Sequence, residues 1–182
     1  GYRVTLMPTF SGRGDCIYAL DERVELDFLA DRVTSNTRSI WIRLHRFWAL
    51  RKLIVQTKPD VIVSFLTHVN VVAVLSAFGS DIPVIVSERT YPPSMPLGFI
   101  LETLRKLLYP SAEAVVMQTG QGLAWLKSRI SHNNGVVIPN PVSYPMVRSA
   151  PVVIPKDIIS EARKICLSVG RLSEEKCYSE VI

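Results

Sequence analysis

The sequence predicts an α/β protein built on a Rossmann-like parallel sheet, followed by the start of a second Rossmann-like domain. Two observations predict this fold class. Short runs rich in β-branched residues alternate with helical segments that are long enough to cross between parallel strands. Most of these runs are apolar throughout, which is typical of strands whose two faces are both covered by helices.

The order of the elements follows from these patterns. The segment 143–164 begins with a proline-rich stretch of little helical periodicity, so we interpret it as a linker. It separates a first domain, 1–142, from the beginning of a second domain, 165–182. The predicted strands are 2–7, 24–29, 61–66, 83–88, 114–119, 135–139 and 165–170, and the predicted helices are 37–57, 68–78, 98–109 and 119–130.

Composition limits the class of protein. The chain has 182 residues, of which 48% are hydrophobic and 20% charged, enough to bury one sizeable core. Its apolar stretches are shorter than the ~20 residues that a membrane-spanning helix needs, and it opens with no signal peptide, so we expect a soluble or peripheral protein. The three cysteines, Cys16, Cys166 and Cys177, are widely spaced, which favours a reducing cytosol over a disulfide framework or a zinc site.

The charge is positive and unevenly distributed. The chain has 21 Lys and Arg against 16 Asp and Glu, a net charge of +5, and the excess lies between Arg38 and Lys58. This region should attract anions, but charge does not distinguish nucleic acid, anionic lipid and phosphorylated substrates. The helix predicted there either packs an apolar stripe against the core or places Trp41 and Trp48, among its basic residues, in the headgroup region of an anionic membrane.

Polar residues follow the predicted strands. Open parallel sheets bind ligands beyond the carboxyl ends of their strands, so these positions are the first candidates for a site. They are Thr67, His68, Glu88, Arg89, Thr119, Asn140, Gly170 and Arg171.

Five motifs carry a resemblance to a known family. They are "KPDVIVSFLTHVNV", "PVIVSERT", "LLYPSAEAVVMQT", "VVIPNPV" and "LSVGRLSEEK". Each is weak by itself, but in this order they are together fairly specific. The chain resembles the family 4 retaining glycosyltransferases of the GT-B type, and within it the bacterial enzymes that add hexoses or N-acetylhexosamines to lipid-linked glycans.

The resemblance implies two Rossmann-like domains across a cleft, the acceptor on the first and a nucleotide sugar on the second. It implies transfer of a hexose or N-acetylhexosamine, with retention, from a UDP-linked donor to a lipid-linked glycan acceptor. No metal cofactor is expected, and the sequence contains no Asp-x-Asp pair. The family's first strand and glycine-rich loop, and the paired glutamates of its second domain, have no counterpart here. We therefore expect a fragment and leave open whether it is active.

For the donor side, the resemblance implies that Gly170, Arg171 and Lys176 bind the diphosphate. Two fixed cations near a helix amino terminus stabilise the charge that a departing diphosphate gathers. Cys177 stands where the family commonly has a glycine. The alternative is that both cations are ordinary solvated charges at a strand-to-helix turn.

For the acceptor side, the resemblance places Glu88 and Arg89 at the cleft. Glu88 would hydrogen-bond an acceptor hydroxyl and belongs with Arg171 and Lys176 among the candidate catalytic residues, while Arg89 would bind an acceptor phosphate. The alternative is that Glu88 and Arg89 pair with each other or with neighbours.

Three further residues are candidates for binding. His68 and Asn70 would contact the acceptor, although His68 is equally placed to cap its helix. Asn140 would line the nucleotide side of the cleft, or it serves a structural role between Pro139 and Pro141, whose fixed torsions pin a crossover.

The partners expected are thus a nucleotide sugar, a lipid-linked acceptor and an anionic membrane surface, with the protein cytoplasmic and peripheral on the inner face of the membrane. Two alternatives remain open: a sugar-nucleotide epimerase of GT-B architecture and a non-catalytic membrane or polyanion binder. Nucleic-acid binding is disfavoured because no recognition motif accompanies the basic residues. A hydrolase is disfavoured because the sequence lacks a Gly-x-Ser-x-Gly elbow.

Overall fold

A computed structural model describes residues 1–9, 19–33, 40–132, 134–142, 144–145, 170 and 177–180. The chain divides into two compact units, residues 1–141 and 142–182. Of the second unit only a few residues are described, among them a short 3-10 helix at Tyr178–Glu180. Apart from Gly170, the predicted strand 165–170 lies outside the described residues.

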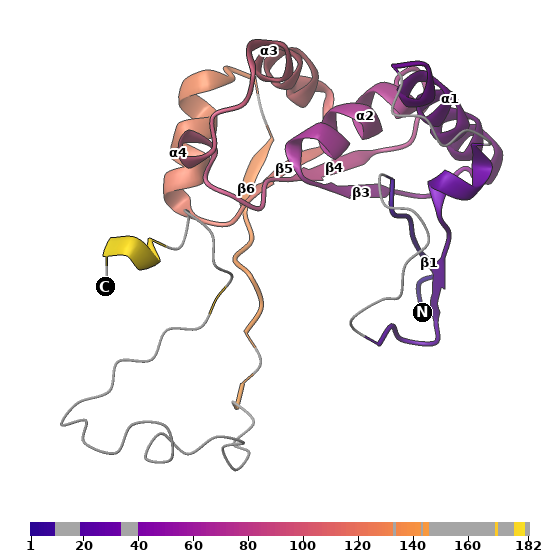
Figure 1. Cartoon of the computed structure of the whole chain (residues 1–182), viewed down its shortest axis with the longest axis horizontal. Helices are drawn as coiled ribbons and strands as arrows, with labels where there is room; N and C mark the ends of the chain where they lie inside the picture. Colours follow the sequence, from indigo (N-terminus) through magenta and orange to yellow (C-terminus); the bar gives the residue numbers. More distant parts are fainter. Residues whose placement is uncertain are drawn as a thin grey trace. The chain divides into compact units, whose positions relative to one another are not determined.

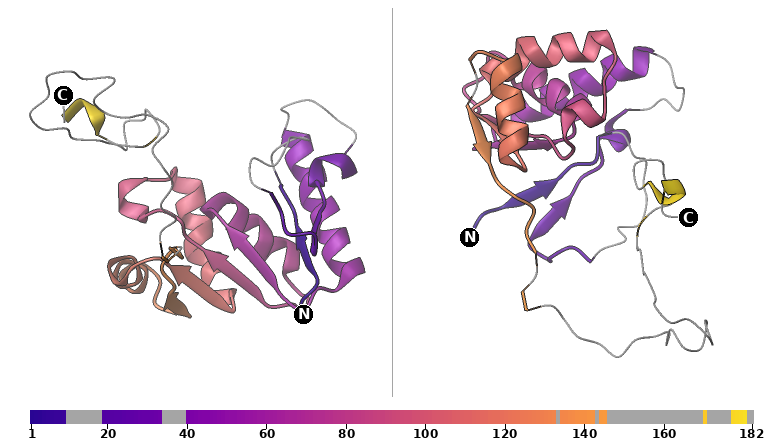
Figure 2. Two further views of the ribbon diagram at one scale, coloured as in Figure 1. Left: turned by 90° about the horizontal axis from the view of Figure 1, so that it is seen from below. Right: turned by 90° about the vertical axis from the view of Figure 1, so that its left-hand side faces the viewer.

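The first unit contains a four-stranded parallel sheet. Its strands are β3 (Ile62–Phe65), β4 (Val84–Ser87), β5 (Ala114–Met117) and β6 (Gly135–Val137), and they lie side by side in chain order. Figure 2 shows this sheet from two directions. The predicted α/β fold with a Rossmann-like parallel sheet is therefore confirmed.

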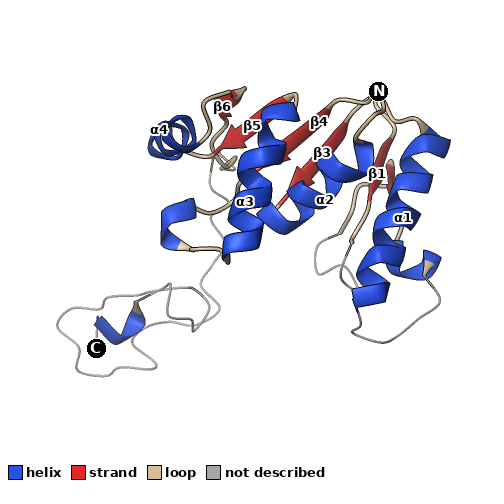
Figure 3. Ribbon diagram, turned by 90° about the horizontal axis from the view of Figure 1, so that it is seen from above, coloured by secondary structure: helices blue, strands red, loops and turns tan. Residues whose placement is uncertain are grey.

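The helices between these strands all lie on one face of the sheet. They are α2 (Thr67–Ala77), α3 (Phe99–Leu108) and α4 (Gly120–Arg129), and Figures 1 and 3 show them on the same side. Because connections between parallel strands are right-handed, strands that follow one another in chain order place successive helices on the same face. The core forms between the two layers from side chains that include Val86, Val115, Met117, Tyr109 and Leu126.

The opposite face of the sheet is partly exposed. The apolar side chains of Val63, Phe65 and Val136 are 51%, 48% and 40% exposed. The sequence predicts strands covered on both faces, whereas among the described residues helices lie against one face of this sheet. The register pairs Phe65 with Ser87, so the end of β3 lies beside the end of β4.

The two amino-terminal strands form a sheet of their own. β1 (Val4–Leu6) and β2 (Val24–Leu26) pair with each other in parallel and with no other described strand. Both strands lie within predicted ones, 2–7 and 24–29, and they form a sheet separate from that of β3 to β6.

Helix α1 (Ile40–Thr57) packs beside α2. Arg51 fixes the contact by donating to the carbonyl oxygens of Ser76 (3.0 Å) and Phe78 (2.8 Å) at the end of α2, where a helix leaves carbonyl groups without partners. The predicted apolar stripe of α1 is divided, since Ile54 is buried whereas Trp48 is 62% exposed. None of the helices among the described residues has the length and apolarity required to cross a membrane.

The connection from β3 to α2 is a sharp turn at Leu66. Its φ of 75° lies in a region that residues with a side chain seldom adopt. The turn is held by bonds from the Leu66 N–H to the Ser87 carbonyl (3.3 Å) and from the Asn70 N–H to the Leu66 carbonyl (2.8 Å). Phe65 and Thr67 thereby leave the turn in different directions.

Candidate functional site

Polar side chains, together with the aromatic ring of Phe65, gather at the carboxyl ends of β3 to β6, in two groups. The first, which we term the buried cluster, lies between α2, α3 and the end of β4. It consists of Thr67, Asn70, Glu88, Glu102, Arg105 and Tyr109. The second, which we term the strand-end row, lies at the ends of four successive strands. It consists of Phe65, Arg89, Gln118 and Asn140.

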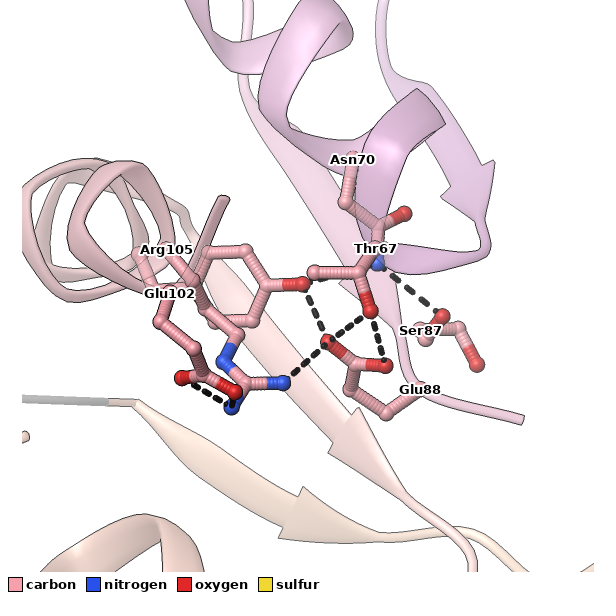
Figure 4. A network of polar contacts seen from close by, with 7 residues as sticks. Thr67, Asn70, Ser87, Glu88, Glu102 and Arg105 are labelled. Carbon is pink, nitrogen blue, oxygen red and sulfur yellow. Dashed lines mark hydrogen bonds and ion pairs between the residues drawn. The ribbon is translucent and has the colours of Figure 1, made fainter. Parts of the chain in front are cut away.

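Glu88 is the centre of the buried cluster, and its side chain is 5% exposed. The Thr67 hydroxyl donates to both carboxylate oxygens, at 3.1 and 2.9 Å, and the Tyr109 hydroxyl donates to Oε1 (Figure 4). Arg105 Nη1 lies 3.9 Å from the same oxygen. Burial, the nearby charge of Glu88 and this hydrogen bond raise the pKa of the Tyr109 hydroxyl far above its ordinary value, so Tyr109 remains a donor.

The Arg105 side chain is 1% exposed, and two contacts compensate the burial of its charge. Its Nη2 lies 2.6 and 2.5 Å from the two oxygens of Glu102, and its guanidinium lies over the Trp125 ring at 4.6 Å from the centroid. A buried guanidinium needs such partners because the loss of hydration is costly. Arg105 therefore ties α3 to α4 and to Glu88.

Asn70 belongs to α2 and is 0% exposed. It accepts from the Ser64 hydroxyl (2.8 Å) and donates to the Ser87 carbonyl and the Tyr109 hydroxyl, both at 3.1 Å. Its amide thus links α2 to β3, β4 and the residue after α3. Since neither Asn70 nor Glu88 is open to solvent in this structure, their contacts with an acceptor stay predictions, and the contacts described here are internal.

The strand-end row is exposed, and Arg89 is its centre. Arg89 follows Glu88 directly, yet it lies on the outside, with its guanidinium carbon 5.6 Å from the centroid of the Phe65 ring. Arginine stacks on aromatic faces in this way. No ion pair to Arg89 occurs within the part of the chain that the structure describes.

Gln118 joins Arg89 to Asn140. The orientation of a glutamine amide follows from its partners, because its oxygen and nitrogen are nearly equal in size. In one orientation Nε2 donates to Asn140 Oδ1 at 2.9 Å. In the other, Oε1 accepts from Arg89 Nε (3.2 Å) and from Asn140 Nδ2 (3.3 Å), while Nε2 donates to the Arg89 carbonyl (3.3 Å). The second satisfies both contacts with Arg89, and its 2.9 Å contact with Asn140 is a hydrogen bond when the Asn140 amide is turned as well, so that its nitrogen faces Gln118 Oε1.

The remaining candidates are placed as follows. His68 is exposed in the first turn of α2. Thr119 caps α4 by accepting from the Gly122 N–H at 3.1 Å, which gives it a structural role. Gly170 is exposed, whereas Arg171 and Lys176 lie outside the described residues. Among the residues described, no three His, Cys, Asp or Glu side chains are grouped so that they could hold a metal ion, and independence from metal stays a prediction.

The rule that site residues lie directly after each predicted strand misses Gln118 because of where one strand is predicted to end. The predicted strand 114–119 includes this residue, whereas β5 ends at Met117. Gln118 is therefore the first polar side chain after β5, in the position that the rule selects. Tyr109 and Arg105 carried no such signal, because they belong to the end of α3 and to the turn that follows it.

Comparisons with known proteins agree with this architecture. A family described as glycosyl transferase 4-like domain matches residues 2–141. A curated relative is 30% identical over 103 residues, which are 56% of this chain. It is the GalNAc-α-(1→4)-GalNAc-α-(1→3)-diNAcBac-PP-undecaprenol α-1,4-N-acetyl-D-galactosaminyltransferase of Campylobacter jejuni subsp. jejuni. The match spans 28% of that relative's length.

Proposed function

Since the chain belongs to the glycosyl transferase 4-like domain family, we propose that it contributes the acceptor side of a glycosyltransferase. The reaction is the transfer of a hexose or N-acetylhexosamine from a UDP-linked sugar to a lipid-linked glycan, with retention of configuration. The family match over residues 2–141 carries the proposal. The name of the relative, which acts on an undecaprenol-diphosphate glycan, supports the choice of acceptor.

The strand-end row supplies chemistry for this acceptor. An exposed guanidinium binds phosphate oxygens through charge-assisted hydrogen bonds, and the amides of Gln118 and Asn140 beside it suit sugar hydroxyls, since an amide both donates and accepts. In this proposal Arg89 binds an acceptor phosphate. The buried cluster positions the row by fixing the end of β4 against α2 and α3.

On the donor side, we propose that Gly170, Arg171 and Lys176 bind the diphosphate of the nucleotide sugar. The two cations stabilise the charge that develops on the departing diphosphate, so no metal is required. The protein otherwise acts by holding donor and acceptor in reacting geometry. We retain the division into an acceptor-side domain at 1–142, a linker at 143–164 and a donor-side domain that begins at 165.

A transfer assay tests the proposal. The protein is incubated with radiolabelled UDP-N-acetylgalactosamine, UDP-N-acetylglucosamine or UDP-glucose and a polyprenyl-diphosphate oligosaccharide, and the lipid fraction is counted. We expect label in the lipid fraction, an α-anomeric product by NMR, and loss of product in Arg171→Ala and Lys176→Ala. Conversion of the UDP sugar without an acceptor would indicate an epimerase instead.

Helix α1 supports an additional partner, an anionic membrane surface. Trp41 and Trp48 are 67% and 62% exposed on this helix, and the basic side chains of Arg43 and Lys52 are also exposed. Aromatic and basic side chains together favour the headgroup region of an anionic bilayer. We propose that the protein is cytoplasmic and docks through α1 on the inner face of the membrane.

Flotation with phosphatidylglycerol vesicles tests this docking. We expect the protein to float, and Arg43→Glu with Lys52→Glu to abolish flotation. The matched control reverses two exposed charges on α4, Lys127→Glu with Arg129→Glu, and should float like the unchanged protein. Flotation without any transfer would favour the non-catalytic binder.

A further inference from the structure

We propose that Gln118 is a positioning residue that fixes the direction in which Arg89 presents its guanidinium to a phosphate group. The inference rests on the proposed function, in which Arg89 binds the phosphate of an acceptor, and adds a residue that determines how the phosphate approaches. It follows from the contacts of Arg89 with Gln118 and Phe65.

The first step concerns the nitrogen atoms of Arg89. A guanidinium offers two forks to an oxyanion, one formed by Nε with a terminal nitrogen and one formed by the two terminal nitrogens. In the orientation of the Gln118 amide that satisfies Arg89, Oε1 lies 3.2 Å from Arg89 Nε, so the fork that contains Nε is occupied. The end-on fork of Nη1 and Nη2 is left for the ligand.

The second step concerns the plane of the guanidinium. Arg89 lies over the Phe65 ring, 5.6 Å from its centroid, so one face of the guanidinium is covered. In the same orientation Gln118 Nε2 donates to the Arg89 carbonyl at 3.3 Å, and Oε1 faces the Asn140 amide. The amide is thus anchored to the end of β4 and to the segment after β6. An amide held in this way fixes the direction of the Arg89 side chain.

The third step concerns charge. Four other arginines of the described residues pair with a carboxylate: Arg3 with Glu25, Arg23 with Asp21, Arg32 with Asp27, and Arg105 with Glu102. Arg89 is instead held by a neutral amide and an aromatic ring. Gln118 therefore orients the guanidinium without neutralising it, and the positive charge remains for an anion.

The amide at position 118 explains why a glutamate would not serve. A carboxylate of the same shape would accept from Arg89 Nε equally well, but it would form an ion pair and compete with the phosphate. Gln118→Glu therefore keeps the shape of the side chain at position 118 and changes only its charge. Gln121→Glu adds the same charge at an exposed position of α4 and is the matched control.

The experiment measures binding of inorganic pyrophosphate to the 182-residue chain by calorimetry and by ¹⁵N NMR of the arginine Nε–H groups. Every protein compared carries Arg171→Ala and Lys176→Ala, so that the proposed donor site does not contribute. We expect Gln118→Glu and Arg89→Ala to raise the dissociation constant by about tenfold or more, which corresponds to ~1.4 kcal/mol. Gln118→Ala should raise it about threefold, because the charge persists while its direction is lost. Gln121→Glu should leave it unchanged.

The NMR signal separates positioning from a general effect on folding. In the unchanged protein the Nε–H of Arg89, assigned by its absence in Arg89→Ala, should exchange slowly with water. Gln118→Ala should speed this exchange while circular dichroism stays the same. UDP and phosphatidylglycerol vesicles serve as separate arms, and they show whether the fork prefers a free diphosphate, a nucleotide diphosphate or a lipid phosphate.

Four results would overturn the inference: no pyrophosphate binding by the unchanged chain, equal affinity in Arg89→Ala, equal affinity in Gln118→Glu, or an Arg89 Nε–H that exchanges as fast as those of solvated arginines. The proposed function fails independently, by absence of label transfer in the lipid assay. Transfer with unaltered affinity in Gln118→Glu would therefore reject the positioning role and keep the function.

Discussion

Glu88 and Arg89 are consecutive residues of opposite charge, and the structure treats them in opposite ways. Glu88 is 5% exposed and is bound by Thr67, Tyr109 and Arg105. Arg89 is exposed and is bound by an amide and an aromatic ring. Successive side chains at the end of a strand point to opposite faces, so one carboxylate holds the fold while the neighbouring guanidinium is available to a ligand.

The comparison separates stability from binding. Changes in the buried cluster should lower the free energy of unfolding, whereas changes in the strand-end row should alter anion binding at nearly constant stability. Four substitutions test this division, in order of decreasing expected effect on stability.

Glu88→Ala should have the largest effect. It leaves the Thr67 and Tyr109 hydroxyls without their acceptor and removes one of the carboxylates near Arg105, so we expect a loss on the order of 3 kcal/mol. Urea unfolding followed by circular dichroism measures it. Glu88→Gln keeps an acceptor oxygen and should lose less. If Glu88→Ala were as stable as the unchanged protein but failed to bind an acceptor, Glu88 would belong with Arg89 on the ligand side.

Asn70→Ala should cost about 2 kcal/mol, because it leaves the buried Ser87 carbonyl and Tyr109 hydroxyl without a donor and opens a small cavity. The same urea titration measures this loss. Pyrophosphate affinity of the folded fraction should be unchanged. A variant of full stability with weakened acceptor binding would instead support the predicted contact of Asn70 with the acceptor.

Tyr109→Phe should cost about 1 kcal/mol at neutral pH, the typical value of one hydrogen bond. Its effect reverses at high pH. The pKa of Tyr109 is raised in the folded protein above its ordinary value of 10.0, so the stabilisation is complete below that value and is lost as pH rises through the folded pKa. Above about pH 10 the unfolded chain releases a proton that the folded chain keeps, which costs up to ~1.4 kcal/mol per pH unit. Above about pH 10 the free energy of unfolding should therefore fall less steeply with rising pH in Tyr109→Phe than in the unchanged protein. Equal slopes would contradict the raised pKa of Tyr109.

Arg89→Ala should have the smallest effect on stability, within about 0.5 kcal/mol, since it removes an exposed cation–π contact. A decrease in the free energy of unfolding comparable to that of Glu88→Ala would show that Arg89, like Glu88, stabilises the fold. Arg129→Ala, which removes an exposed arginine of α4, is the matched control for the loss of one positive charge.

Much of the local structure was predictable. Each of the six observed strands lies inside a predicted one, because β-branched apolar runs bounded by turns are a local signal. The separation of β1 and β2 from the other strands was not predictable, since it depends on which edges pair. The buried side of α1 was also missed, because apolar residues such as Ile42 and Trp48 lie on different sides of the helix and a helical projection does not choose between them.

The placement of the strand-end row at one edge of the sheet was predictable, whereas the contacts of the buried cluster were not. Arg89 and Asn140 follow their strands, and the rule that ligands bind at carboxyl ends places both at one edge. The burial of Glu88 depends on Tyr109, 21 residues away in sequence, and no local pattern announces such a partner. Gln118 required the true end of β5, and an error of two residues concealed it.

Leu66 lies between Phe65, which supports Arg89, and Thr67, which binds Glu88. Its backbone, at φ 75° and ψ 136°, is strained for a residue with a side chain, at a cost on the order of 1–3 kcal/mol. The turn at this edge of the sheet therefore stores conformational strain. A glycine at position 66 would relieve this strain and raise the free energy of unfolding. It would also loosen the turn that fixes the directions of the Phe65 and Thr67 side chains, so the strained turn serves the geometry of the sheet edge at the expense of stability.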